Sequence, residues 1–499
     1  MSLISLNYLI FLPLSVIVYY IFPKKFRYIW LTAVSIAFYA LSAPPFYTFA
    51  FVAGEALLTY LAALLGAGLR KKGRSRADTW LTAASVTVIA VVWLLLNGGG
   101  LWAFGGLRRL PVAASLGISY YSLQLVGYLL DTHWEMAKPQ KNPLKILLFA
   151  CFYPQMTAGP IHGSSYIDEI CGGNGFDEKL FREGCRRILW GFFKKLVICE
   201  RVAMIVNAAW GETLSAGGEA VLQSGGWKWI AILLFPYQLY TDFSGCMDIV
   251  TGSGMLYGIR MPENFNNPFF SQSVQEFWQR WHITLGQWAK NYIFYPLLKT
   301  RAMQSLSKKL SRKAGKKAGR NIVTIIALFV LWLFMGVWHG EWHYVVGESA
   351  FFWLVISLSL VLAPLFDKTK KMLRIKNDAT WWRVFCAVRT YLVYCIGIHF
   401  FRAPSFASGL KFLGDAIAHP LLYLGTASDS GVSAIDIVIM CLGAAVIFAV
   451  SLFREKKKDV DSIPAPVRIT LLLLLFAAVL LFGCYGSGFD ATGFIYNKY

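Results

Sequence analysis

Long apolar runs separated by short polar segments dominate this chain. Each run is about 17–25 residues long, which is enough for a helix to cross a hydrocarbon core of about 30 Å. The runs are continuous and do not alternate apolar and polar residues, so they predict helices rather than the strands of a transmembrane barrel. We therefore expect an all-α, polytopic membrane protein. The expected spans lie near residues 3–22, 26–42, 46–69, 80–97, 111–130, 143–158, 186–209, 228–258, 321–338, 344–363, 384–401, 435–453 and 466–485, and the run 228–258 is expected to be broken.

Clusters of basic residues between the apolar runs predict the orientation. Under the positive-inside rule, short loops rich in Lys and Arg face the cytoplasm. With these loops inside, Met1 and the tail 486–499 are expected on the extracytoplasmic side of a bacterial plasma membrane. The clusters occupy residues 24–27, 70–76, 138–145, 367–376 and 454–458.

Composition agrees with a membrane protein. The chain is 57% hydrophobic and only 15% charged, against about 25% charged residues in soluble domains. Its net charge of +21 could indicate a nucleic-acid-binding protein, but the basic residues lie in short loops, so we expect a lipid bilayer and no nucleic acid as partner. The nine cysteines form no CxxC pair, which favours free core thiols over disulfides or a zinc cluster.

The segment 259–298 is not a normal span. Within 273–292, apolar side chains recur at helical spacing and polar ones fill the opposite face, which predicts an amphipathic helix at an interface or in a re-entrant layer. Glu276 and Arg280, four residues apart, are expected to pair along it. His282 lies at the edge of the apolar face, beside Trp281, and could point into the protein.

The next stretch, 299–320, is rich in Lys and Arg and has no acidic residue. One interpretation is a cytoplasmic loop that faces anionic lipid. The other is a docking surface for an anionic donor or for an acidic carrier protein that presents an acyl group.

Polar residues at membrane depth are costly and usually functional. The run 237–258 contains Asp242 and Asp248 among small residues, which include Ser244. The glycines and serines permit a broken helix or close helix contact. Two carboxylates six residues apart do not share a helix face, so an acid/base dyad is not expected. Two interpretations remain, a buried hydrogen-bond network with a neighbouring arginine and the ion site of a cation-coupled transporter.

Two histidines follow the apolar run 321–338. His339 and His343 are four residues apart, as in helical zinc sites. The glutamate of the string His-Gly-Glu-Trp-His is one position away from that of HExxH, Gly340 weakens a helix there, and no third ligand is evident beyond Glu348. We therefore expect no metal. A single neutral histidine suffices as a general base, which favours His339, with His343 in support.

Several segments together resemble one family. They are "LGISYYSLQLVGYLLD" (116–131), "FYPQMTAGPI" (152–161), "QLYTDFSGCMDI" (238–249), "PENFNNPFFSQSVQEFWQRWHITLGQW" (262–288) and "MGVWHGEWHYVVG" (335–347). In this order they are similar to motifs of the membrane-bound O-acyltransferases, in the bacterial branch of alginate O-acetyltransferases and teichoic acid D-alanyltransferases. Glu341 departs from the small residue that follows "WHG" in that branch, so the acceptor side is expected to be more polar.

The resemblance implies a ring of about 11–13 transmembrane helices with re-entrant segments around a central tunnel. Residues 1–365 would form the catalytic core, made of N-terminal helices 1–110 and the motif-bearing region 111–365, and 366–499 would complete the same membrane domain. His339 is implied to be the base, and His282 occupies the second essential position, facing the donor entrance. Supporting or tunnel-lining residues would be Asp242, Ser244, Asp248, Glu276, Arg280, Trp281, Trp338 and Glu341.

The expected function is transfer of an acyl group, most simply acetyl, from a cytoplasmic thioester to an extracytoplasmic hydroxyl. The donor would be acetyl-CoA or an acyl carrier protein, and no permanently bound cofactor is expected. The acceptor would be a cell-surface polysaccharide or an esterase-like relay protein. The alternatives are D-alanyl transfer to teichoic acid from a carrier-protein thioester and, in another class, an ion-coupled transporter or flippase.

Overall fold

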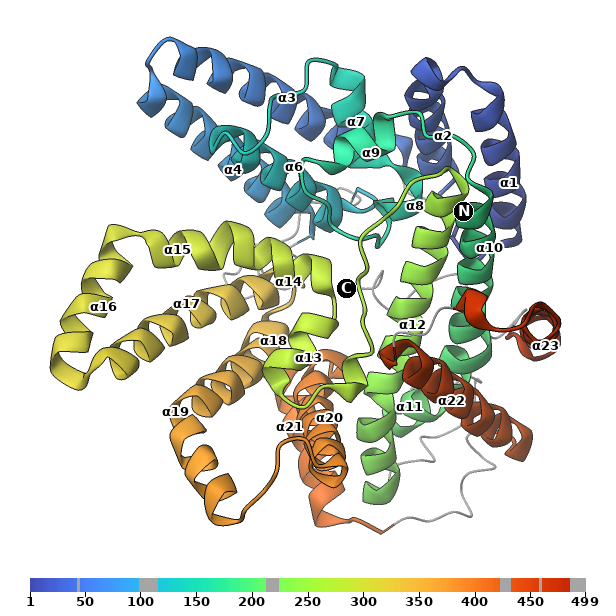
Figure 1. Ribbon diagram of the computed structural model, residues 1–499, viewed down its shortest axis with the longest axis vertical. Coiled ribbons are helices and arrows are strands. Elements are labelled where there is room, and N and C mark those ends of the chain that lie inside the picture. Colours follow the sequence, from blue (N-terminus) through green and yellow to red (C-terminus); the bar gives the residue numbers. More distant parts are fainter. Residues whose placement is uncertain (43–44, 98–114, 212–223, 422–431, 457–459, 485–499) are drawn as a thin grey trace. The chain divides into compact units, whose positions relative to one another are not determined.

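The computed structural model describes residues 1–42, 45–97, 115–211, 224–421, 432–456 and 460–484. Within these ranges the chain forms helices and no β-strand, apart from a single bridge between Phe265 and Trp281 (Figure 1). The predicted extracytoplasmic tail 486–499 lies outside the described residues.

Seven helical segments in the described part of the chain are long and apolar enough to cross a membrane. This confirms an all-α, multi-pass membrane protein. The segments are Phe46–Lys71, Ser75–Asn97, Lys316–Trp338, Trp342–Met372, Thr380–Arg402, Ala434–Glu455 and Ala465–Phe482, and a shorter apolar helix covers Leu6–Ile21.

The described chain divides into two compact units that interleave along the sequence. Among the described residues, unit 1 contains Met1–Phe192 and Phe243–Glu263, and unit 2 contains Phe193–Asp242 and the residues from Asn264 to Cys484. The division falls inside one helix, α12 (Gly225–Leu256), whose first part belongs to unit 2 and whose last part belongs to unit 1.

Unit 1 is built from helices of very different lengths. The longer ones are α3 and α4, which pack against each other and against α6. Its helices are α1 (Leu6–Ile21), α2 (Arg27–Leu41), α3 (Phe49–Lys71), α4 (Ser75–Asn97), α6 (Ile118–His133), α7 (Pro143–Cys151), α8 (Tyr153–Met156), α9 (Tyr166–Cys171), α10 (Glu178–Phe192) and the end of α12.

A buried aromatic cluster holds the end of α12 in unit 1. The Tyr8 ring packs 6.2 Å from both Phe38 and Tyr153, measured between ring centroids. The hydroxyl of Tyr8 lies 2.8 Å from that of Ser253, and the hydroxyl of Tyr153 lies 2.9 Å from that of Tyr257. These hydrogen bonds satisfy hydroxyl groups that would otherwise be costly to bury.

The predicted break in the run 228–258 is wrong, because α12 is one continuous helix. Its small residues serve close helix packing instead. A Cβ added at Gly252 would lie 2.7 Å from the Gly184 carbonyl oxygen, and one added at Gly191 would lie 2.6 Å from the Gly245 carbonyl oxygen. Glycines therefore let α10 and α12 approach each other closely.

Some predicted spans are shorter than expected. The run 143–158 forms α7 and α8, which are separated at Phe152, where the backbone is not helical. Pro154 enters at the start of α8, because proline is tolerated in the first turn of a helix but not in its interior. The run 186–209 is divided among α10, the π-helix η3 (Phe193–Cys199) and α11 (Glu200–Ala209).

Unit 2 carries most of the spanning helices. Besides η3, α11 and the start of α12 it contains α13 (Val274–Arg280), α14 (Ile283–Ala289), the π-helix η5 (Lys290–Phe294), α15 (Tyr295–Lys299), α16 (Arg301–Ala314), α17 (Lys316–Trp338), α18 (Trp342–Tyr344), the π-helix η6 (Val345–Ser349), α19 (Ala350–Met372), α20 (Thr380–Arg402), α21 (Phe406–Ala418), α22 (Ala434–Glu455) and α23 (Ala465–Phe482).

The basic stretch 299–320, which the sequence suggested as a cytoplasmic connection or a docking surface, is helical. Helices α16 and α17 form a tight hairpin (Figure 1). Gly315, with φ of +85°, makes the turn between them, a conformation that glycine adopts readily. Gly319 allows the close approach, because a Cβ there would lie 2.4 Å from the Ser311 hydroxyl oxygen.

An aromatic core joins the helices of unit 2 that surround α13. Trp278 packs against Trp332 of α17 at 5.0 Å and against Phe352 of α19 at 4.9 Å, between ring centroids. Phe277 packs against Tyr394 of α20 at 4.0 Å. Aromatic pairs at these separations stabilise beyond their buried area, so α13 is fixed against three spanning helices.

Candidate active site

The segment that carries His282 is not the single amphipathic helix that the sequence predicts. Helix α13 ends at Arg280, Trp281 is extended, and α14 begins at Ile283. Between them His282 adopts the left-handed conformation, with φ of 45° and ψ of 51°. A residue with a Cβ adopts this conformation at a cost of about 1–2 kcal/mol, so the surrounding structure must hold it there.

Asn264 helps to stabilise this backbone conformation through three hydrogen bonds. Its backbone carbonyl accepts a hydrogen bond from the Ile283 N–H at 3.0 Å. Its side-chain oxygen accepts two more from Thr284, one from the N–H at 3.1 Å and one from the hydroxyl at 3.0 Å. His282 occupies the N-cap position of α14 without a capping side chain, so Asn264 caps this helix from a distant part of the sequence.

His339 lies directly after the last residue of α17. The helix ends there because Gly340 follows with φ of +88°, a common way to terminate a helix. The His339 side chain is buried. Its ring is 5.7 Å from that of Tyr344 and 5.2 Å from that of Phe401, measured between centroids.

Trp338 brings the two histidines together. Its ring centroid is 5.9 Å from that of His282 and 5.0 Å from that of His339. His282 is also buried. Both imidazoles therefore border the same tryptophan.

Burial sets the protonation state of both imidazoles, which lie outside the helices long enough to span the membrane. Desolvation lowers the pKa of His339 to about 3. The pKa of His282 is also lowered well below its usual value, first by desolvation and then by repulsion from a proton on His339. Both are neutral at neutral pH, and a neutral imidazole can accept a proton.

Asp242 lies in the same unit but belongs to another cluster. It is completely buried and forms an ion pair with Lys195 at 2.7 Å. The Lys195 amine also lies 2.6 Å from a Glu200 carboxylate oxygen, and the Cys199 thiol lies 3.7 Å from Asp242. A buried carboxylate is stable when it is paired in this way, so the pair joins α12 to η3.

Ser244 and Asp248 belong to unit 1. Ser244 is buried in α12. The Asp248 carboxylate accepts a hydrogen bond from the Arg187 Nε at 2.8 Å, and the other end of this guanidinium binds Glu263. A neighbouring arginine was one of the two interpretations of these aspartates, and the structure supports it. The continuous α12 removes the broken helix on which the transporter interpretation depended.

Glu276 and Arg280 form the predicted i,i+4 pair, with 2.9 Å between their charged groups. Arg280 also binds Glu455, at the end of α22, at 3.1 Å. Trp281 is buried against Phe265 at 5.0 Å and against Tyr394 at 5.4 Å, between ring centroids. These residues hold the segment that carries His282.

The remaining candidates lie around α18. Glu341 is exposed at the start of this short helix, so it does not lie in the buried cluster. His343 is half-buried and stacks on Tyr344 at 4.1 Å between centroids. Among the residues that the structure describes, no three His, Cys, Asp or Glu side chains are grouped as metal ligands.

Sequence reasoning missed the residues that hold the site. Asn264 lies in the quoted "ENFN" motif, but no pattern showed that it would cap α14. Lys195 and Arg187 lie in the expected span 186–209, where no pattern assigned them a partner. Tyr344 and Phe401 read as ordinary apolar residues of a span. Intramembrane acidic residues require partners, and this was the one available signal for Lys195 and Arg187.

Comparisons with known proteins identify related chains. Residues 138–401 match the membrane-bound O-acyltransferase family. A probable alginate O-acetylase of Pseudomonas fluorescens is 30% identical over 290 residues, which are 58% of this chain and 55% of the relative. A peptidoglycan O-acetyltransferase of Helicobacter pylori is 28% identical over 330 residues, 58% of this chain and 60% of the relative.

A teichoic acid D-alanyltransferase of Bacillus subtilis is 29% identical over 186 residues, 36% of this chain and 44% of the relative. The chain thus spans somewhat more than half the length of the acetylating relatives and less than half of the D-alanylating one.

Proposed function

Because this chain belongs to the membrane-bound O-acyltransferase family, we propose that it transfers an acetyl group from a cytoplasmic thioester, most simply acetyl-CoA, to a hydroxyl group on an extracytoplasmic acceptor. The observation that carries the proposal is the buried pair of His282 and His339, both of which lie within 6 Å of the Trp338 ring. Two neutral imidazoles in a buried aromatic setting suit proton transfer during acyl exchange.

His339 is the proposed general base. It removes the proton from the acceptor hydroxyl, whose oxygen attacks the thioester carbonyl; the C–O bond forms, the C–S bond breaks, and the thiol leaves with a proton. Burial makes His339 a weaker base than free imidazole. The rings of Trp338, Tyr344 and Phe401 lie within 6 Å of it, and such faces stabilise a cation as it forms.

His282 is proposed to orient the thioester or to assist the transfer, to the leaving thiolate, of the proton that His339 takes from the hydroxyl. Its left-handed backbone fixes where the imidazole points. Asn264, Arg280 and the aromatic core around Trp281 hold that segment in place. Asp242 and Asp248 support the fold through their ion pairs and are not proposed to touch substrate.

The proposed acceptor is a cell-surface polysaccharide or an esterase-like relay protein that passes the acetyl group on. Alginate and peptidoglycan acetylation by the relatives support a polysaccharide. The proposed location is the bacterial plasma membrane with the N-terminus outside, where a tunnel through the family's helical ring would join donor and acceptor. D-Alanyl transfer from a carrier protein is the second candidate, supported by the D-alanylating relatives and the basic hairpin.

Labelled donors test the proposal. Membrane vesicles from host cells that carry the chain together with its neighbouring genes receive either radiolabelled acetyl-CoA or a D-alanyl-carrier thioester. Label from acetyl-CoA in the envelope polysaccharide supports acetyl transfer, with vesicles of His339→Ala as the control. Label from the carrier thioester alone would replace the acetyl assignment with D-alanylation, and label from neither donor would contradict acyl transfer.

A further inference from the structure

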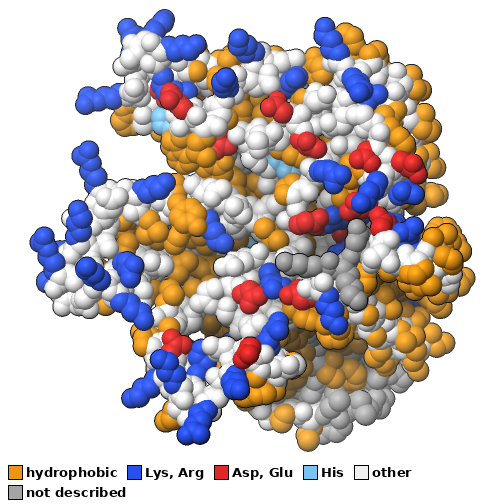
Figure 2. All heavy atoms as spheres, viewed as in Figure 1, with side chains coloured by type: hydrophobic (Ala, Val, Ile, Leu, Met, Phe, Trp, Pro, Cys, Tyr) orange, Lys and Arg blue, Asp and Glu red, His pale blue; other side chains and the backbone are white. Residues whose placement is uncertain are grey.

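The hairpin of α16 and α17 carries an unbalanced positive charge. Figure 2 shows Lys and Arg side chains crowded at its end. No acidic residue occurs between Lys299 and Arg320, and within the described chain these basic side chains form no ion pair. The exposed ones are Lys299, Arg301, Lys308, Lys309, Arg312, Lys313, Lys316, Lys317 and Arg320.

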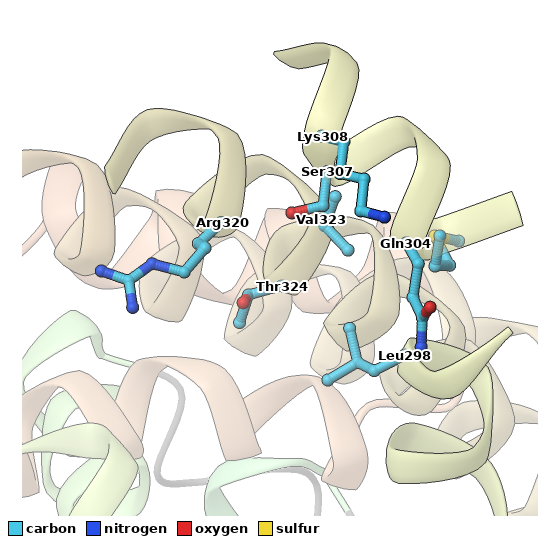
Figure 3. A pocket seen from close by; sticks show the side chains of 8 residues that line it. Leu298, Gln304, Ser307, Lys308, Arg320, Val323 and Thr324 are labelled. Carbon is cyan, nitrogen blue, oxygen red and sulfur yellow. The ribbon is translucent and has the colours of Figure 1, made fainter. Parts of the chain in front are cut away.

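A pocket of about 420 Å³ lies where α15, α16 and α17 meet (Figure 3). One part of its lining is apolar, from Leu298, Met303 and Val323. The other part is polar or cationic, from Gln304, Ser307, Lys308, Arg320 and Thr324. Its volume falls within the range of about 300–1,000 Å³ that is usual for small-molecule sites.

The pocket lies where the sequence of α17 changes from charged to apolar residues. The helix is charged from Lys316 to Arg320 and apolar from Ile322 onward, and this apolar part is one of the spanning segments. Arg320, Val323 and Thr324 line the pocket at this change. The junction between charged and apolar helix marks the level of lipid headgroups in a bilayer. Arg320 is therefore expected at headgroup depth, and Val323, about one helical turn further along α17, at the edge of the acyl region.

We propose that this pocket binds the phosphate of an anionic glycerophospholipid headgroup. Lys308 provides a point charge and Arg320 a planar fork of donors, two common ways to bind phosphate. The hydroxyls of Ser307 and Thr324 are further donors within the lining. Leu298, Met303 and Val323 would contact the glycerol and the first part of the acyl chains.

The apolar lining distinguishes a lipid from other anions. A soluble phosphate gains nothing from an apolar wall, whereas a glycerophospholipid can contact both the cationic and the apolar residues of the lining. The surrounding basic side chains would raise the local concentration of anionic lipid. The inference depends on the hairpin alone and does not require the proposed acyl transfer.

Lipid binding to charge-matched variants tests the proposal. The full chain is purified in nanodiscs of phosphatidylcholine with a minor fraction of phosphatidylglycerol, and retained lipid is measured by native mass spectrometry. The variant K308Q/R320Q changes the pocket. The control K309Q/R312Q removes the same charge from exposed α16 positions outside the lining. We expect about tenfold less retained phosphatidylglycerol in the pocket variant and a near-wild-type amount in the control, with equal melting temperatures.

Three results would overturn the inference. Equal losses in both variants would indicate a diffuse cationic surface and not a site. Displacement of phosphatidylglycerol by inorganic phosphate or glycerol phosphate at millimolar concentration would indicate a soluble anion site. Binding of an acidic acyl carrier protein that is lost equally in both variants, with unchanged lipid, would indicate a protein-docking surface.

Discussion

Replacing Asn264 by alanine is expected to damage the site through the backbone of the segment that carries His282. The change removes the acceptor of two hydrogen bonds from buried Thr284. A buried donor left unsatisfied costs about 1–3 kcal/mol, and a lost helix cap costs about 1 kcal/mol. The Thr284 hydroxyl can rotate toward another acceptor, which reduces the penalty. We therefore expect Asn264→Ala to cost about 2 kcal/mol in total.

That penalty is comparable with the strain stored at His282. Its left-handed backbone costs about 1–2 kcal/mol, so the loss of the two side-chain hydrogen bonds of Asn264 is as large as the strain that these bonds help to hold. If the whole penalty falls on the competent geometry, acyl transfer slows by about 30-fold. Asn264→Asp keeps an acceptor oxygen in the same place and should retain more activity than Asn264→Ala.

The assay compares transfer rate and melting temperature in reconstituted vesicles for Asn264→Ala, Thr284→Val and the double variant. Thr284→Val removes the hydroxyl donor at nearly constant shape. The losses of rate and stability in the double variant should therefore be smaller than the sum of the losses in the two single variants. The reason is that the Thr284 hydroxyl, which Asn264→Ala leaves without its acceptor, is absent from the double variant. An Asn264→Ala protein with wild-type rate and wild-type melting temperature would refute this reasoning.

Three further predictions concern stability. Asp242→Asn breaks the buried pair with Lys195 and should cost about 3–5 kcal/mol, seen as a lower yield of folded protein in detergent; an unchanged yield and melting temperature would be inconsistent with the pair. Gly252→Val forces a side chain against α10 and should cost about 1–3 kcal/mol, whereas Gly54→Val, with open space around its Cβ position, should leave melting unchanged. Burial lowers the pKa of His339 to about 3, against about 6.5 when unfolded; its stabilising contribution is therefore complete above pH 6.5 and is lost as the pH falls, by about 2 kcal/mol at pH 5. His339→Asn should show a smaller drop in melting temperature between pH 7 and pH 5, and an equal drop would argue against a buried neutral imidazole.

The membrane class of the protein follows from sequence because apolar length alone decides whether a helix can span a bilayer. The helix pair Glu276 and Arg280 was predictable for a similar reason, since their spacing fixes their separation. Features of this kind are determined by residues that lie close together in the sequence, so they can be predicted without knowledge of the rest of the fold.

The break at His282 could not be predicted in this way. The apolar residues of 273–292 keep helical spacing on both sides of it, and only the distant Asn264 shows why the chain turns there. Continuity of α12 was equally hidden, because glycines that break a helix and glycines that pack one look alike until Gly184 is seen opposite Gly252. Long-range contacts determine both features.

The most direct test of the central claim is the acyl-transfer rate of His339→Ala against that of His343→Ala, in vesicles with matched amounts of folded protein. A positioned general base contributes about 10²–10⁴-fold to rate, so His339→Ala should lose at least about 100-fold. His343, half-buried beside Tyr344, should be replaceable with a rate close to wild type. A His339→Ala protein that transfers acyl groups at the wild-type rate would contradict the account.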